Sequence, residues 1–186
     1  MKKTLSMLII ASASFGFMAT AAHADHHMEA KKITKAEFDD VKKRADADHK
    51  AAKDACDKHS GNAKDVCKAE AKAAHTKTVA EAEASYKNTP KAWEKARKDV
   101  ADDNYKAAKQ KCDDLSGNPK DVCQKDAKAK HEAAVADAKA DKKSADAHKD
   151  AAKDKRDAEV KAAKERCDAM SGADKDRCIG EANAKR

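Results

Sequence analysis

Large apolar residues are few and widely spaced along this chain, and alanine fills most of the other non-polar positions. Between them run short blocks of lysine and acidic residues, which place opposite charges a few positions apart, as in Glu94 and Arg97. Alanine, lysine, glutamate and arginine are strong helix formers, and side chains three or four residues apart are neighbours on a helix. Glycine and proline, which interrupt helices, number only 5 and 2. The pattern predicts an all-α protein of long antiparallel helices.

The same pattern excludes a conventional globular core. A fully buried large apolar side chain contributes about 1.5–3 kcal/mol, whereas ordering each residue costs roughly 1–2 kcal/mol of backbone entropy. Two classes remain: a disordered charged chain, or alanine-based helices with thin contact seams held by covalent links. The helix-forming composition favours the second.

Three segments align without gaps, and each is bounded by two cysteines: 56–67, 112–123 and 167–178. His75 and His131 also fall at equivalent positions in the first two copies. Such internal repetition indicates a chain built from copies of one supersecondary unit. We expect three helical hairpins, over 33–88, 89–144 and, truncated, 145–186.

Each hairpin is predicted to turn at a glycine: Gly61, Gly117 or Gly172. Glycine can end a helix in the left-handed conformation, because it lacks the Cβ atom that would clash there. The residues just after the glycine should then start the next helix.

Asn62 and Asn118 are the expected N-caps of those second helices, each with an acidic residue three positions on. Pro119 would occupy the first helical position, where a missing N–H is harmless. In the third copy Asp174 would take over the cap.

A second kind of break, Asn88-Thr89-Pro90, offers a cap and a proline that start another helix. The matching position around Ser144 has no proline, so the helices on its two sides are either separate or continuous. Both a zigzag bundle and an extended rod fit the sequence. The predicted helices cover 31–60, 63–87, 90–116, 119–143, 145–171 and 174–184.

The cysteines of each copy stand at equal distances from the glycine turn, and therefore at one height on two antiparallel helices. Helix axes 8–10 Å apart bring facing Cα atoms to roughly 3.5–5.5 Å, within reach of a disulfide. We expect the pairs Cys56–Cys67, Cys112–Cys123 and Cys167–Cys178. A metal or redox role is the alternative, but the spacing matches neither a zinc finger nor a Cys-x-x-Cys motif.

Residues 1–24 have the features of a signal peptide: Lys2 and Lys3, an apolar run, and Ala22-His23-Ala24 as a cleavage site. Nothing downstream is apolar enough to span a bilayer. The sequence thus predicts an exported, periplasmic protein cleaved after Ala24, with a flexible N-terminus over 25–32.

Cleavage after Ala24 would expose Asp25-His26-His27 at the new N-terminus. A free amine, two backbone amides and the imidazole of His27 can surround a metal in a square plane, which suits Cu(II) or Ni(II). We therefore consider a metal site at Asp25, His26 and His27, with a solvated N-terminus as the alternative.

The sequence offers no phosphate-binding glycine loop, nucleophile elbow or His-Glu-x-x-His motif, and it predicts a protein that is not an enzyme. His75 and His131 are taken as residues of a solvated helix face, and Tyr86, Trp93 and Tyr105 as seam residues. The chain carries 41 basic and 34 acidic residues in mixed order, which is not the concentrated field of a nucleic-acid groove.

The alanine-, lysine- and acid-rich stretches over residues 30–186 resemble the helical periplasmic spacer of TolA-type cell-envelope proteins. That resemblance implies a mechanical or scaffolding role, although the cysteine hairpins depart from the spacer. The leading hypothesis is a structural or interaction protein that meets envelope proteins, the cell wall or anionic surfaces. A Cu(II)- or Ni(II)-binding protein is the second hypothesis and a polyanion binder the third; the oligomeric state stays open.

Overall fold

The computed structural model describes residues 32–184, and 89% of these are helical, with no strand among them. The described part of the chain contains five helices. These are α1 (Lys35–Cys56), α2 (Gly61–Lys87), α3 (Pro90–Cys112), α4 (Gly117–Cys167) and α5 (Gly172–Ala184). The all-α fold of disulfide-linked antiparallel helices predicted from the sequence is therefore confirmed.

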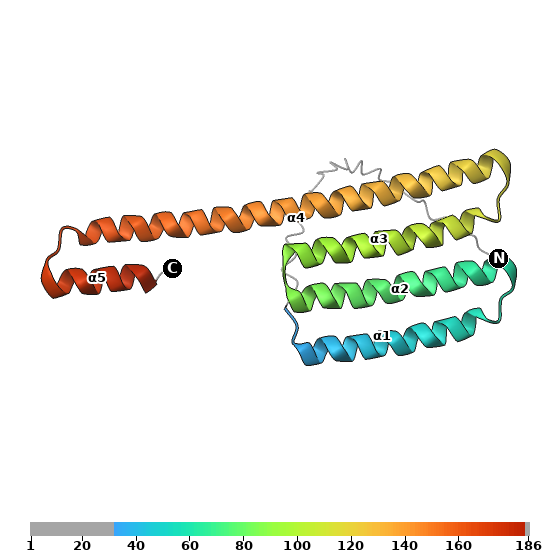
Figure 1. Ribbon diagram of the computed structural model, residues 1–186, viewed down its shortest axis with the longest axis horizontal. Coiled ribbons are helices and arrows are strands. Elements are labelled where there is room, and N and C mark those ends of the chain that lie inside the picture. Colours follow the sequence, from blue (N-terminus) through green and yellow to red (C-terminus); the bar gives the residue numbers. More distant parts are fainter. Residues whose placement is uncertain (1–31, 185–186) are drawn as a thin grey trace, which may run out of the picture.

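The helices are arranged as a single layer that follows the order of the chain (Figure 1). Within residues 32–184, contacts between helices join only α1 with α2, α2 with α3, α3 with α4, and α4 with α5. The first four helices run side by side in a zigzag, and α4 continues far beyond the end of α3. The shorter α5 folds back along the far half of α4, on the same side of α4 as α3.

Each hairpin turn contains a glycine in the left-handed conformation, with φ of +56°, +59° and +61° at Gly61, Gly117 and Gly172. No atom lies within 4 Å of a Cβ built on any of the three. The need for glycine therefore comes from the backbone angle and not from crowding.

The start of each second helix differs from the sequence prediction. The extended residues before α2 and α4 are Ser60 and Ser116, and the glycines themselves are the first helical residues. Asn62 and Asn118 thus lie inside the first turn and are not N-caps, and Asn62 instead donates to the carbonyl oxygen of Gln110 on α3. The predicted N-caps therefore lie two residues too far along the chain, because the extended residue comes before the left-handed glycine and not after it.

Several other predicted helix boundaries also differ from the structure. The first helices end at their cysteines, four residues earlier than predicted, because residues such as Asp57 form a separate turn. Pro119 is the third residue of α4, where its missing N–H still has no helical partner to lose. Asp174 lies inside α5 and pairs with Arg177 instead of capping the helix.

The break before α3 is where the sequence places it. Asn88 adopts the left-handed conformation with φ of 46°, and the hydroxyl of Thr89 accepts a hydrogen bond from the backbone N–H of Ala92. Pro90 is the first residue of α3. At Ser144, by contrast, the helix is continuous, which gives α4 its 51 residues.

Apart from Val160, the fully buried apolar residues among 32–184 are all alanines and cysteines. Ala80 and Ala84 of α2 pack on Ala96 of α3, and Ala92 and Trp93 lie against this cluster. Since alanine has a small side chain, these seams gain little from apolar burial and depend on the helices lying close together. Among the described residues, no helix has the length and hydropathy required to cross a membrane.

One acidic residue, Asp103 of α3, is buried among these alanines at 7% exposure. It accepts hydrogen bonds from the Thr76 hydroxyl of α2 and from Lys106, both at 2.7 Å. Burial raises the pKa of Asp103, but the bonds from Lys106 and Thr76 outweigh it and leave the pKa below its usual value. The carboxylate therefore stays charged and links α2 to α3.

The disulfide of the second hairpin should contribute strongly to stability. We expect Cys112→Ser with Cys123→Ser to lower the free energy of unfolding by about 3 kcal/mol, because a short closed loop is released. Thermal unfolding followed by circular dichroism measures the loss.

The control is the pair Cys167→Ser with Cys178→Ser, which frees only α5. Because α5 contacts only α4 among the described helices, the main transition should then move little. Equal losses from the two variants would contradict this assignment.

Candidate functional site

The six cysteines form three disulfides, Cys56–Cys67, Cys112–Cys123 and Cys167–Cys178, as predicted. Their Cα atoms are 5.5, 5.7 and 5.7 Å apart, and the first cysteine of each pair is almost fully buried. With every thiol consumed, this state has no thiolate for metal binding or nucleophilic attack.

Each disulfide is accompanied by an equivalent ion pair across its turn, and in the first turn Lys68 adds a second pair with Asp57. Lys64 pairs with Asp57 at 3.0 Å, Lys120 with Asp113 at 2.9 Å, and Lys175 with Asp168 at 3.0 Å. Lys64 and Lys68 hold the pKa of Asp57 below its usual value through their hydrogen bonds. The three turns thus share both a covalent and an electrostatic link.

The predicted signal peptide and the proposed metal residues Asp25, His26 and His27 lie outside the described residues. Within 32–184, no three His, Cys, Asp or Glu side chains are grouped so as to hold a metal ion.

Two clusters of an acid, a histidine and an aromatic ring bridge adjacent helices. Between α1 and α2, Nε2 of His75 lies 2.7 Å from Asp46, and its ring stacks on His49 with centroids 4.8 Å apart. Between α3 and α4, His131 lies 2.6 Å from Asp102 and stacks on Tyr105 at 5.0 Å.

These clusters correct the interpretation of His75 and His131 as residues of a solvated face. Their side chains are 24% and 23% exposed, and both lie in seams between helices. A signal for this was present in the sequence, because His49 aligns with Tyr105 and Asp46 with Asp102. This pattern can be recognised only when the sequences of the two helices in each hairpin are compared with each other.

The other aromatic residues behave as predicted. Tyr86 of α2 stacks on Phe38 of α1 with centroids 5.7 Å apart, and Trp93 packs against the Ala80–Ala84–Ala96 cluster. All three predicted seam residues, Tyr86, Trp93 and Tyr105, therefore contact a neighbouring helix.

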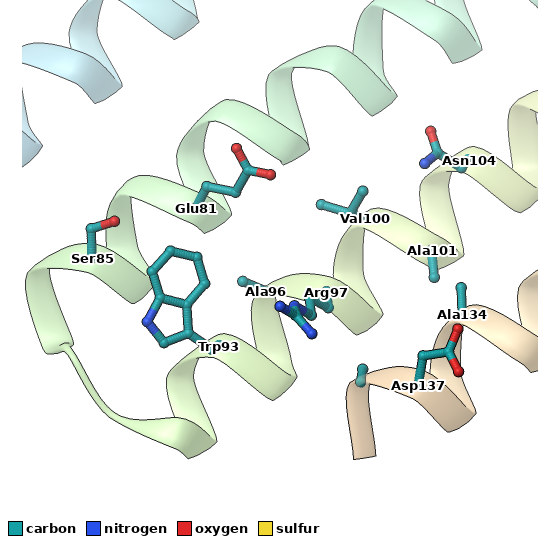
Figure 2. Close-up of a pocket in the computed structure, with 11 residues that line it drawn as sticks. Glu81, Ser85, Trp93, Ala96, Arg97, Val100, Ala101, Asn104, Ala134 and Asp137 are labelled. Carbon is teal, nitrogen blue, oxygen red and sulfur yellow. The ribbon is translucent and has the colours of Figure 1, made fainter. Parts of the chain in front are cut away.

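An open groove of about 590 Å³ runs over α3, between α2 and α4 (Figure 2). Its floor is formed by residues of α3, including Trp93, Ala96 and Val100. Glu81 and Ser85 of α2 border one side, and residues of α4 border the other. The groove follows from the single-layer arrangement, in which no helix of the described part of the chain covers this face of α3.

Charged groups lie beside this apolar strip. Arg97 lines the groove and pairs with Asp141 of α4. Burial lowers the pKa of Arg97, and the nearby Asp137 opposes that shift. The groove thus combines an indole ring, small aliphatic side chains and charges of both signs, which suits contact with an amphipathic polypeptide.

Searches of family models, curated proteins and solved structures give no match for this chain.

The stacked pair His49 and His75 makes the first hairpin sensitive to pH. The pKa of His49 is lowered from 6.5, first by burial and then by charge on His75, Lys53 and Lys72, with Asp46 opposing them. Because folding disfavours the charged form of His49, this residue does not reduce the free energy of unfolding above pH 6.5, where it is neutral in both states. Stability falls as the pH drops below 6.5 towards the lowered pKa.

We expect His49→Tyr, which copies the Tyr105–His131 stack, to remove this part of the pH dependence while keeping the ring contact. Histidine NMR titration of the wild type should place the His49 midpoint below 6.5. Unfolding curves between pH 5 and 7 should then differ in slope between the two proteins. Parallel slopes would show that His49 is not the source.

Proposed function

We propose that this chain is a non-enzymatic structural or interaction protein of the bacterial periplasm, a scaffold of disulfide-linked helices in the cell envelope. The observation that carries the proposal is the single layer of helices, in which each helix of residues 32–184 packs only on the helices next to it in the chain. Such a layer exposes far more surface for its size than a globule does, and its broad faces are open to partners.

The three disulfides support an oxidising compartment for the chain. The signal-peptide pattern over residues 1–24 points to the same compartment. In that setting the disulfides act as structural links, since the alanine seams contribute little stability of their own.

The surface chemistry also fits a scaffold. Among the ion pairs formed within a single helix, most join residues four positions apart, such as Lys35 with Asp39 and Lys153 with Asp157. These pairs balance charge locally along each helix. A polyanion binder would instead concentrate cations on one face.

A scaffold role predicts that loss of the chain weakens the envelope of its native host. We expect a deletion strain to become sensitive to detergent and to leak periplasmic protein. Plasmid-borne wild type should restore both properties, and Cys112→Ser with Cys123→Ser should restore them only in part.

The matched control is His26→Ala with His27→Ala, which removes the alternative metal site. Full complementation by this variant supports the scaffold. Failure of this variant alone, or an intact envelope in the deletion strain, would reject the scaffold in favour of metal handling or another role. Intact mass spectrometry of the periplasmic fraction reports cleavage after Ala24 and the three disulfides in the same samples.

A further inference from the structure

The packing of α2 on α3 supplies a template for a contact that α4 does not make within one chain. Ala73, Ala80 and Ala84 of α2 are buried, as are Ala96 and Ala107 of α3. The turn at Asn88–Pro90 lets the two helices meet as an antiparallel pair.

The aligned cysteines relate α2 to the first half of α4 and α3 to its second half. Alanine recurs at the matching positions. Those that match Ala73, Ala80 and Ala84 are Ala129, Ala136 and Ala140. Those that match Ala92, Ala96 and Ala107 are Ala147, Ala151 and Ala162. All six of these alanines on α4 are exposed.

These alanines lie on one side of α4 between residues 129 and 162. Residues two positions apart on a helix point about 200° away from each other. Ala129 is two residues from buried Ala127, Ala136 is two from buried Ala138, and Ala162 is two from buried Val160. Because α3 and α5 lie on the same side of α4 (Figure 1), no helix within residues 32–184 packs on the opposite side of α4.

The charged residues beside the alanines of α4 have opposite signs at the positions that match charge pairs between α2 and α3. Lys111 of α3 pairs with Glu70 of α2 at 2.6 Å, and the matching residues of α4 are Arg166 and Asp126. The charge pairing is kept. Within one straight helix these two residues are about 60 Å apart, so they cannot meet in the same chain.

A second pair retains its complementarity with both signs reversed. Glu83 of α2 and Lys95 of α3 line the same crevice between the two helices. The pKa of Glu83 is lowered mainly by Lys87 and that of Lys95 is raised mainly by Asp99, and the opposite charges of Glu83 and Lys95 add to both shifts. The matching residues of α4 are Lys139 and Asp150. Two simultaneous reversals keep opposite charges facing each other, although about 16 Å of helix separates the two residues within one chain.

We propose that a second copy of this chain covers this face. The two α4 helices pair antiparallel, so that residues 119–143 of each copy pack on 145–167 of the other, as α2 packs on α3. The two-fold axis passes close to Ser144, and every contact occurs twice, as in an isologous dimer. The continuous helix at Ser144 turns an internal hairpin contact into one between copies.

The first test is the mass of the purified, oxidised chain by sedimentation. We expect twice the mass of one chain for the wild type. Ala136→Glu with Ala151→Glu should give the mass of one chain, because four carboxylates would then face each other in the seam. A wild type that stays a single chain at its highest soluble concentration would overturn the proposal, as would a double variant that remains dimeric.

The matched control is Ala145→Glu with Ala152→Glu. These alanines are also exposed on α4, but lie on the side that faces α3 and α5. This variant should remain a dimer, and both variants should keep wild-type helicity because each replaces exposed alanines. Dissociation of the control would show that the proposed face is wrong.

The second test reverses charges across the interface. Lys139→Asp and Asp150→Lys should each weaken dimerisation several-fold, and the combined variant should restore it by copying the Glu83–Lys95 arrangement. Additive weakening would exclude the proposed register. Amine cross-linking should also join Lys143 to Lys143, a link that can form only between copies and that lies at the proposed axis.

Discussion

The close approach of neighbouring helices is the constraint on which this structure depends. Alanine seams stabilise a helix pair only when the two backbones lie near each other, because the side chains are short. The disulfides fix that approach at each turn, with Cα atoms 5.5–5.7 Å apart, and the left-handed glycines allow the chain to reverse there. Further along the seams, the same spacing brings Asp46 to His75, Asp102 to His131 and Thr76 to Asp103. These polar bridges then hold the helices where alanine contributes little.

Much of this arrangement could be predicted from the sequence, since the cysteines and glycines act locally. The disulfide pairs follow from their equal distances to Gly61, Gly117 and Gly172, and the start of α3 follows from Thr89 and Pro90. The exact helix ends could not be predicted, because Asp57 keeps nearly helical angles after the last residue of α1, before the chain becomes extended at Ser60. At Ser144 the decisive feature is an absence: without a proline or glycine, nothing stops a helix once it has formed.

The candidate sites were harder to predict because they belong to pairs of helices. Taken alone, His75 and His131 look like polar residues on a solvated surface, and only the partner positions His49 and Tyr105 reveal the stacking. The groove over α3 is still less visible in the sequence. It requires Trp93 from one helix, Glu81 from the preceding one and Asp137 from the next, and no local pattern brings these together.

The two edges of the helix layer differ in a way that bears on how the layer ends. On α1, three of the four positions two residues from buried or half-buried Ala45 and Ala52 carry exposed charges, Lys43, Lys50 and Asp54, and the fourth is the exposed Ala47. A charged outer face is how stacked helical arrays end in water. On α4, the corresponding outer positions are alanines flanked by complementary charges. The layer therefore ends in a largely charged face at α1 and in an alanine-rich face at α4, and this difference is why a second α4 is the partner that we propose for the α4 edge.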